Sequence, residues 1–213
     1  LSRFSEELVL WASAQFDFID IPDAFCTGSS IMPQKRNPDA AELVRGKSGR
    51  IVGALTALLI VMKGLPMAYA KDMQEDKEPI FTAADQLNAS LEMARVVVDT
   101  AKLNVSKPAE AAEDSWVVAT DLAEALARSG TAFHQAHQIV GRLVLDSVRN
   151  GKKPADWTAE ALVAFDAAFK PEMIALMKPA EGMKTREIRG GTGPATVAAA
   201  LKTARERLAA LAK

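Results

Sequence analysis

The sequence contains a single cysteine, Cys26, so no disulfide bond can form within the chain. The opening residues, Leu1 to Phe4, lack the basic-then-apolar pattern of a secretory signal. Both features predict a reducing, cytoplasmic location. The longest apolar run without charge, residues 51–62, has 12 residues, whereas a helix needs about 20 to cross a bilayer. We therefore expect no membrane partner.

An excess of positive charge is also missing, because 26 Lys and Arg residues face 27 Asp and Glu residues, for a net charge of −1. Proteins that bind nucleic acid use clustered cations against the phosphates. The three tryptophans, Trp11, Trp116 and Trp157, are too scattered to form a surface on which bases stack. The sequence therefore predicts no nucleic-acid partner.

Aromatic residues make up only 6% of the chain, and we find no convincing strand pattern. The two β-branched clusters, residues 96–98 and 117–118, lie inside helical patterns. Alanine, the strongest helix former, occurs 39 times. The composition therefore predicts an all-α fold.

The clearest helix start is Asn37-Pro38-Asp39, which combines a capping residue, a proline at the first helical position and an acid in the first turn. From there one helix is predicted over residues 38–63. Its second half, residues 54–62, is apolar nearly all round, which predicts the interior of a helical bundle. A second long helix is predicted over residues 79–104, with a coiled-coil-like apolar seam. The seam consists of Leu87, Leu91, Ala94, Val98 and Ala101.

Shorter helices follow, separated by glycine and proline. They are predicted at residues 115–128, 131–150, 158–169 and 194–211. We place a domain boundary near residue 110. Residues 1–110 are then part of a central helical bundle, with a distinctive loop at residues 27–37, and residues 111–213 form a small C-terminal helical domain.

That loop, GSSIMPQKRN at residues 28–37, carries the strongest chemical signal. A Gly-Ser-Ser turn, Lys35 and the helix start behind it can direct backbone amides and a cation at one anion. If the carbon beside a bound carboxylate lost a proton there, Lys35, Asn37 and the amides would stabilise the dianion, and Ser29 could act as the base. From spacing alone, the reading of these residues as ordinary loop and capping residues stays open.

The string GSSIMPQKRNPDAAE resembles the signature loop GSSxMPxKxNxxxxE of the fumarase/aspartase superfamily at all eight fixed positions. The matching residues are Gly28, Ser29, Ser30, Met32, Pro33, Lys35, Asn37 and Glu42. Residues 69–78, YAKDMQEDKE, are similar to the YNKDMQEDKE typical of argininosuccinate lyases, with Ala70 in place of asparagine. With further similarity at residues 133–137 and 190–192, the resemblance spans essentially the whole chain and implies roughly the C-terminal half of such a lyase.

The resemblance implies reversible elimination of fumarate from argininosuccinate to give arginine, without a cofactor. It implies that Ser29 is the general base and that Lys35 and Asn37 bind and stabilise the succinyl carboxylates. Glu42 would polarise a catalytic histidine. The substrate-binding positions that it implies are Ser30, Asn37, Tyr69, Gln74 and Lys77. The family's catalytic histidine is expected upstream of Leu1, so the 213-residue chain alone is expected to be inactive.

The resemblance also implies a homotetramer, and the predicted helix length agrees with it. A helix of 26 residues would place Ser29 and Lys35 about 39 Å from Tyr69, Gln74 and Lys77. A substrate of argininosuccinate's size is much shorter, so the two groups are predicted to meet only when they come from different chains. Loop 27–37, a lid in the family, is expected to be the most mobile segment without ligand.

Several alternatives stay open at this stage. Another superfamily lyase, such as fumarase, aspartase or adenylosuccinate lyase, would share the loop and differ at residues 69–77. A structural protein without activity, like some delta-crystallins, would share the fold. His134 and His137 lie three residues apart with no third ligand, so we predict structural or surface roles and no metal site, and Cys26 is predicted to serve packing.

Overall fold

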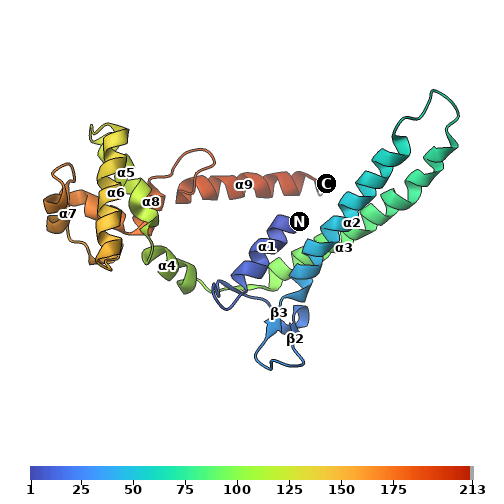
Figure 1. The fold of residues 1–213 in the computed structure, drawn as a ribbon, viewed down its shortest axis with the longest axis horizontal. Helices are drawn as coiled ribbons and strands as arrows, with labels where there is room; N and C mark the ends of the chain where they lie inside the picture. Colours follow the sequence, from blue (N-terminus) through green and yellow to red (C-terminus); the bar gives the residue numbers. More distant parts are fainter. Residues whose placement is uncertain (212–213) are drawn as a thin grey trace. The chain divides into compact units, whose positions relative to one another are not determined.

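The computed structural model describes residues 1–211, and its regular structure is almost entirely helical (Figure 1), which confirms the all-α prediction. The chain divides into two compact units. The first comprises Leu1–Pro108, and the second begins at Ala109. No helix of the described residues is long and apolar enough to cross a membrane.

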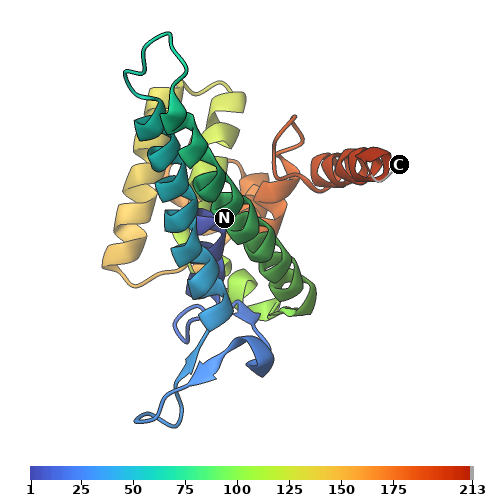
Figure 2. The ribbon, with the colours of Figure 1, turned by 90° about the vertical axis from the view of Figure 1, so that its right-hand side faces the viewer.

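The first unit contains α1 (Ser2–Trp11), α2 (Asp39–Met62) and α3 (Lys77–Thr100). Helices α2 and α3 each have 24 residues and pack side by side as an antiparallel hairpin (Figures 1 and 2), and α1 packs against α2. The prediction of a helix over residues 38–63 is confirmed to within one residue at each end. Two acids in its first turn, Asp39 and Glu42, complement the dipole of α2.

The second long helix begins two residues earlier and ends four residues earlier than residues 79–104. Its start is preceded by a 3₁₀ turn at Lys71–Asp76. Its end is set by Ala101, whose backbone is extended, and by β4 (Lys102–Leu103), which pairs antiparallel with β1 (Ile19–Asp20). The predicted apolar seam therefore ends at Ala101, one residue past the helix, and the chain continues as strand β4.

A second pair joins β2 (Thr27–Gly28) to β3 (Arg36–Asn37), also antiparallel. A short 3₁₀ turn, Asp23–Phe25, precedes β2. The prediction of no strand is therefore wrong in detail. Strands of two residues are too short to show an alternating pattern, so the sequence gives no signal for them.

The core of the first unit lies where α1 meets the start of α2 and the end of α3. Its buried residues are Leu8, Ile19, Ile21, Ala40, Ala41 and Val97. On α3 the predicted seam is instead largely exposed, with Leu91 at 50% and Val98 at 53%, while Ser90 and Val97 are buried. The single chain therefore leaves the large side chains of this coiled-coil-like seam uncovered.

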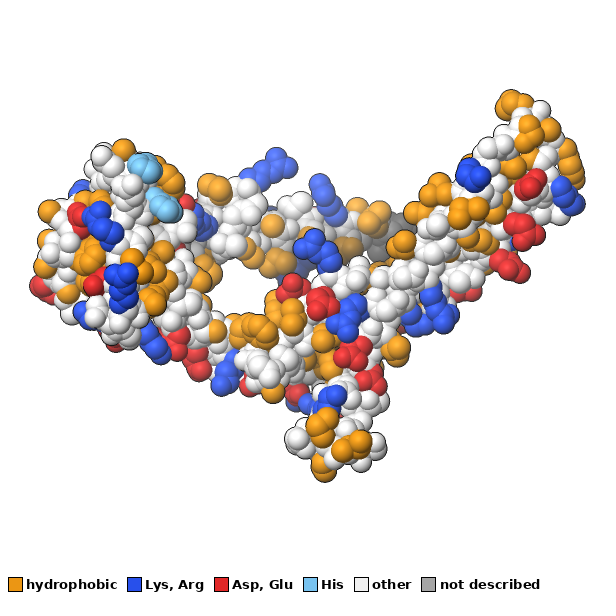
Figure 3. Space-filling view, viewed as in Figure 1, with side chains coloured by type: hydrophobic (Ala, Val, Ile, Leu, Met, Phe, Trp, Pro, Cys, Tyr) orange, Lys and Arg blue, Asp and Glu red, His pale blue; other side chains and the backbone are white. Residues whose placement is uncertain are grey.

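The apolar second half of α2 is likewise not interior to the single chain. Only Ala54 is buried there, and large apolar side chains are more than half exposed. Among them are Leu55, Leu59, Ile60 and Met62, and the exposed Val52 lies just before this segment. Figure 3 shows hydrophobic side chains gathered along the hairpin of α2 and α3. The chain thus presents the surface that was predicted to lie inside a bundle.

The second unit contains α5 (Ala119–Arg128), α6 (Phe133–Arg149), α7 (Ala159–Phe165), α8 (Pro179–Lys184) and α9 (Pro194–Leu211), and α4 (Ser106–Glu113) spans the boundary. Three 3₁₀ turns link them, at Trp116–Val118, Pro154–Asp156 and Pro171–Met177. Helices α5, α6 and α9 match predicted segments, residues 158–169 are helical only over α7, and α4 and α8 were not predicted.

The core of this unit forms around α5 and α6. Its fully buried side chains include Leu122, Leu126, Leu143 and Leu162. Trp157 also lies in the core, where its indole Nε1 donates to Ser147 Oγ at 3.1 Å. This bond satisfies the one polar group of the tryptophan. Helix α9 contains no buried residue.

Candidate functional site

The signature loop, residues 29–35, projects from the β2–β3 pair just before α2 begins (Figure 1). Ser29 is partly buried, and its Oγ accepts the backbone N–H groups of Ile31 at 3.2 Å and Met32 at 3.0 Å. Because both bonds place a donor at the oxygen, they favour negative charge on it. Both bonds are local to the loop and hold the Ser29 hydroxyl against its backbone.

Lys35 and Asn37 lie at the far side of the same loop. Lys35 is exposed and forms no ion pair with any residue in 1–211, so its ammonium can meet an anion. Asn37 is paired with Thr27, whose hydroxyl donates to Asp39 Oδ2 at 2.5 Å. Ser29, Ser30 and Lys35 therefore lie in the loop, and Asn37 lies in β3 at its base.

Arg36, between these two residues, was not singled out from the sequence. Its guanidinium forms ion pairs with Asp20 and Asp23, both at 2.7 Å, and also donates to the carbonyl of Ile21. The hydrogen bond to Asp20 raises the pKa of Arg36 above its ordinary value. The signature has no fixed residue at this position, and Asp20 and Asp23 belong to no motif or helical pattern, so nothing in the sequence pointed to these contacts.

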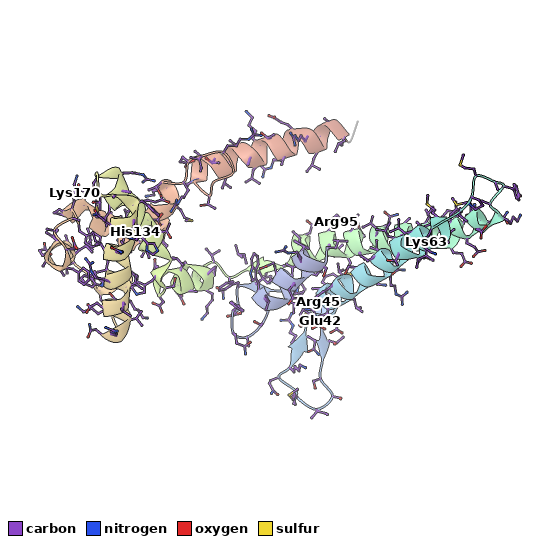
Figure 4. The ribbon with its side chains drawn as sticks, turned by 45° about the horizontal axis from the view of Figure 1, so that its top comes forward. Glu42, Arg45, Lys63, Arg95, His134 and Lys170 are labelled. Atoms are coloured by element: carbon purple, nitrogen blue, oxygen red, sulfur yellow. The ribbon has the colours of Figure 1, made fainter. Side chains whose placement is uncertain are left out.

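Glu42 lies in the first turn of α2, close to Arg45 (Figure 4). Arg45 pairs with Glu6 of α1 at 2.7 Å, whereas the Glu42 carboxylate forms no hydrogen bond or ion pair within residues 1–211. Glu42 is therefore free to act on a group outside the described chain.

The second group of predicted residues lies beyond the other end of α2. Tyr69 is 86% exposed in the turn after α2, Gln74 is in the 3₁₀ turn, and Lys77 starts α3 and pairs with Asp76 at 2.6 Å. The 24 residues of α2 span about 36 Å, and Figure 4 shows Glu42 and Lys63 near its opposite ends. A single chain does not bring Tyr69, Gln74 and Lys77 to the signature loop.

Ala70 adopts a left-handed backbone conformation, with φ of 46° and ψ of 70°. Asparagine, the residue of the YNKDMQEDKE pattern, tolerates this region well, whereas the Cβ of alanine is crowded there. The departure at Ala70 therefore places backbone strain in the turn that carries Tyr69 and Gln74.

The remaining candidates lie apart from both groups. His134 and His137 are exposed on α6, where His134 is hydrogen-bonded to Gln138 and His137 lines a mainly apolar hollow of about 420 Å³. Residues 1–211 contain no cluster of three or more His, Cys, Asp or Glu side chains able to hold a metal ion. Burial raises the pKa of the Cys26 thiol, which favours its neutral form.

Two family models match the chain. One, described as lyase, matches residues 1–53, and the other, argininosuccinate lyase C-terminal, matches residues 116–184. Together they cover parts of both units.

Curated relatives extend the match over nearly the whole chain. The argininosuccinate lyase of Solibacter usitatus is 63% identical over 99% of this chain and 46% of its own length. That of Stutzerimonas stutzeri is 52% identical over 98% of this chain and 45% of its own. This chain thus spans slightly less than half the length of these relatives.

Among solved structures, an EDDS lyase variant with bound fumarate superposes with a TM-score of 0.84 at 25% identity. It covers 97% of this chain, which corresponds to 43% of that protein. The fold, the signature loop and the identity to curated relatives agree, and the chain is similar over nearly its whole length to argininosuccinate lyases.

Proposed function

We propose that this chain provides part of the active site of an argininosuccinate lyase, which eliminates fumarate from argininosuccinate and releases arginine. The observation that carries the proposal is the signature loop, in which Ser29 Oγ accepts two backbone N–H groups and shares the loop with Lys35 and Asn37. The identity of 63% to a curated argininosuccinate lyase supports the choice of this substrate.

In the proposed reaction Ser29 removes a proton from the succinyl carbon next to the carboxylate. The resulting dianion is stabilised by the Lys35 ammonium, by Asn37 and by loop amides, which are charges and dipoles fixed before the reaction. The carbon–nitrogen bond then breaks on the opposite face, and the leaving nitrogen takes up a proton. Glu42 polarises a histidine that lies outside this chain. No cofactor takes part.

The proposal includes a homotetramer whose sites are shared between chains. Ser30 and Asn37 bind substrate from one chain, and Tyr69, Gln74 and Lys77 bind it from another, because α2 separates the two groups within each chain by about 36 Å. The exposed apolar side chains of α2 and α3 support this assembly, since a surface of this kind needs a partner. The partners are therefore other copies of this chain and a small-molecule substrate.

The test uses a full-length chimera, in which this chain replaces the segment that it matches in the Solibacter usitatus relative. The purified chimera should convert argininosuccinate to equal amounts of fumarate and arginine, followed by ultraviolet absorbance and amino-acid analysis. Aspartate, adenylosuccinate and malate serve as competing substrates. A folded tetramer that acts on none of them would overturn the proposal, and preference for a competitor would reassign the substrate.

A further inference from the structure

We propose that Arg36 is a positioning residue, which fixes the base of the signature loop to the core of the first unit and so holds Ser29 and Lys35 in place. This inference rests on the proposed function for its effect on catalysis. Its structural part concerns the order of the loop alone.

The base of the loop is the pair formed by Gly28 and Arg36. Gly28 directly precedes Ser29, and Arg36 directly follows Lys35, so both residues with proposed roles at the reacting carbon adjoin this pair. Each strand has only two residues, and so short a hairpin is not stable on its own. The pair must therefore be held by contacts from outside it.

Arg36 provides three such contacts to one short segment. It pairs with Asp20 and Asp23 at 2.7 Å and donates to the carbonyl of Ile21, a core residue that is only 2% exposed. Bonds between a guanidinium and carboxylates are among the stronger ones in proteins, and the planar fork fixes orientation. The hairpin is also connected to the start of α2, by the hydrogen bond from the Thr27 hydroxyl to Asp39. Arg36 thus connects the loop to the buried core.

The ion pairs of Arg36 with Asp20 and Asp23 also affect the charge beside the loop. Asp20 and Asp23 lie at the base of a loop proposed to bind a substrate with several carboxylates. Arg36 compensates both acids, so that the exposed Lys35 keeps its positive field for the substrate. Removal of Arg36 would free the hairpin and also leave two negative charges beside an anion site.

The experiment compares Arg36→Gln with Arg45→Gln in the chimera. Arg45 is a matched control, because it also pairs with a carboxylate at 2.7 Å and is similarly exposed, but it joins α1 to α2 away from the loop. Amide hydrogen exchange of residues 27–37 reports loop order, and fumarate release gives kcat and KM. Arg36→Lys keeps the charge without the planar fork and serves as the conservative variant, should Arg36→Gln fold poorly.

Arg36→Gln should speed exchange over residues 27–37 and lower kcat, each by about tenfold, because charge-assisted anchoring is lost. Arg36→Lys should recover part of both, and Arg45→Gln should change neither. Exchange and kcat in Arg36→Gln equal to those in Arg45→Gln would overturn the inference. A parent chimera without lyase activity would overturn the proposed function instead, and exchange alone would still decide the role of Arg36.

Discussion

The Ser29 hydroxyl, proposed as the base, is held by two backbone N–H groups, from Ile31 and Met32, and not by a neighbouring side chain. Substitution by alanine removes the proton acceptor and leaves Lys35 and Asn37 in place. Ser29→Ala in the chimera should therefore lower kcat by about 10²- to 10⁴-fold, with the affinity for argininosuccinate nearly unchanged. Steady-state kinetics and calorimetric binding check this, and an unchanged kcat would remove Ser29 from its proposed role.

Ala70 offers a test of strain at a single residue. With its φ of 46°, replacement by glycine or asparagine should raise the free energy of unfolding by about 0.5–1 kcal/mol, because neither is penalised as strongly in this region. Ala68→Gly, in the same exposed turn but without a positive φ, is the control and should not stabilise. Urea unfolding of the chain measures all three, and equal effects at both positions would contradict the strain.

What the sequence could predict differs between individual residues. Ser29, Lys35 and Asn37 belong to a motif with fixed spacing, so the loop that unites them was foreseeable. The anchor at Arg36 was not, because its contacts depend on where the irregular segment around Asp20 and Asp23 folds back. A pattern along the chain does not encode such a return.

At the scale of single elements, the start of α9 depends on one carboxylate. Glu187 accepts the backbone N–H groups of Ala195 at 2.9 Å and Thr196 at 2.8 Å, as well as the Thr196 hydroxyl. These bonds lower the pKa of Glu187 below its ordinary value of 4.5. The bonds thus stabilise the fold above pH 4.5, and this contribution is lost as the pH falls through the lower, folded-state pKa.

We therefore expect Glu187→Gln to reduce the hydrogen-exchange protection of α9 amides at neutral pH. The further decrease in protection as the pH falls should be smaller in this variant than in the unmodified chain. Hydrogen-exchange protection factors of residues 194–211, measured between neutral pH and acid, check this. Glu206→Gln is the control, because Glu206 lies on α9 without a hydrogen bond or ion pair to any residue in 1–211. An acid response that survives in Glu187→Gln would contradict the prediction.

Helix α6 allows a comparison of burial on one element. Leu143 is fully buried between the helices of the second unit, whereas Leu145, two residues on, is 50% exposed. Leu143→Ala should lower the free energy of unfolding by about 2–5 kcal/mol, because it leaves a cavity, and Leu145→Ala by less than about 1 kcal/mol. Chemical denaturation measures both, and similar losses would mean that this core is wrongly assigned.

The elements themselves were largely predictable, since long helices with capping residues and proline boundaries give strong local signals. The burial of their faces was not. Residues 54–62 of α2 read as interior, and α3 carries a coiled-coil-like seam, yet the single chain leaves most of these side chains exposed. Periodicity reveals that a face must be covered, but not whether the cover comes from the same chain.

At the scale of the assembled molecule, the proposed shared site predicts complementation. Ser29→Ala and Lys77→Ala chimeras should each be inactive or weak, while tetramers mixed from both should regain activity. Equal mixing gives roughly a quarter of sites with both residues native, because each is drawn independently from a different chain. Mixed assembly is verified by mass. Mixed tetramers without recovery would place Ser29 and Lys77 in one site from one chain.

The equal length of α2 and α3, 24 residues each, has a consequence for how this family can change over evolution. One inserted residue turns all that follows on a helix by about 100° and moves it by about 1.5 Å. An insertion in α2 would therefore displace Tyr69 and Lys77, and one in α3 would shift the register of the hairpin, in every copy at once. Insertions and deletions should accumulate in the connections of the second unit, such as residues 150–153, and be excluded from helices α2 and α3.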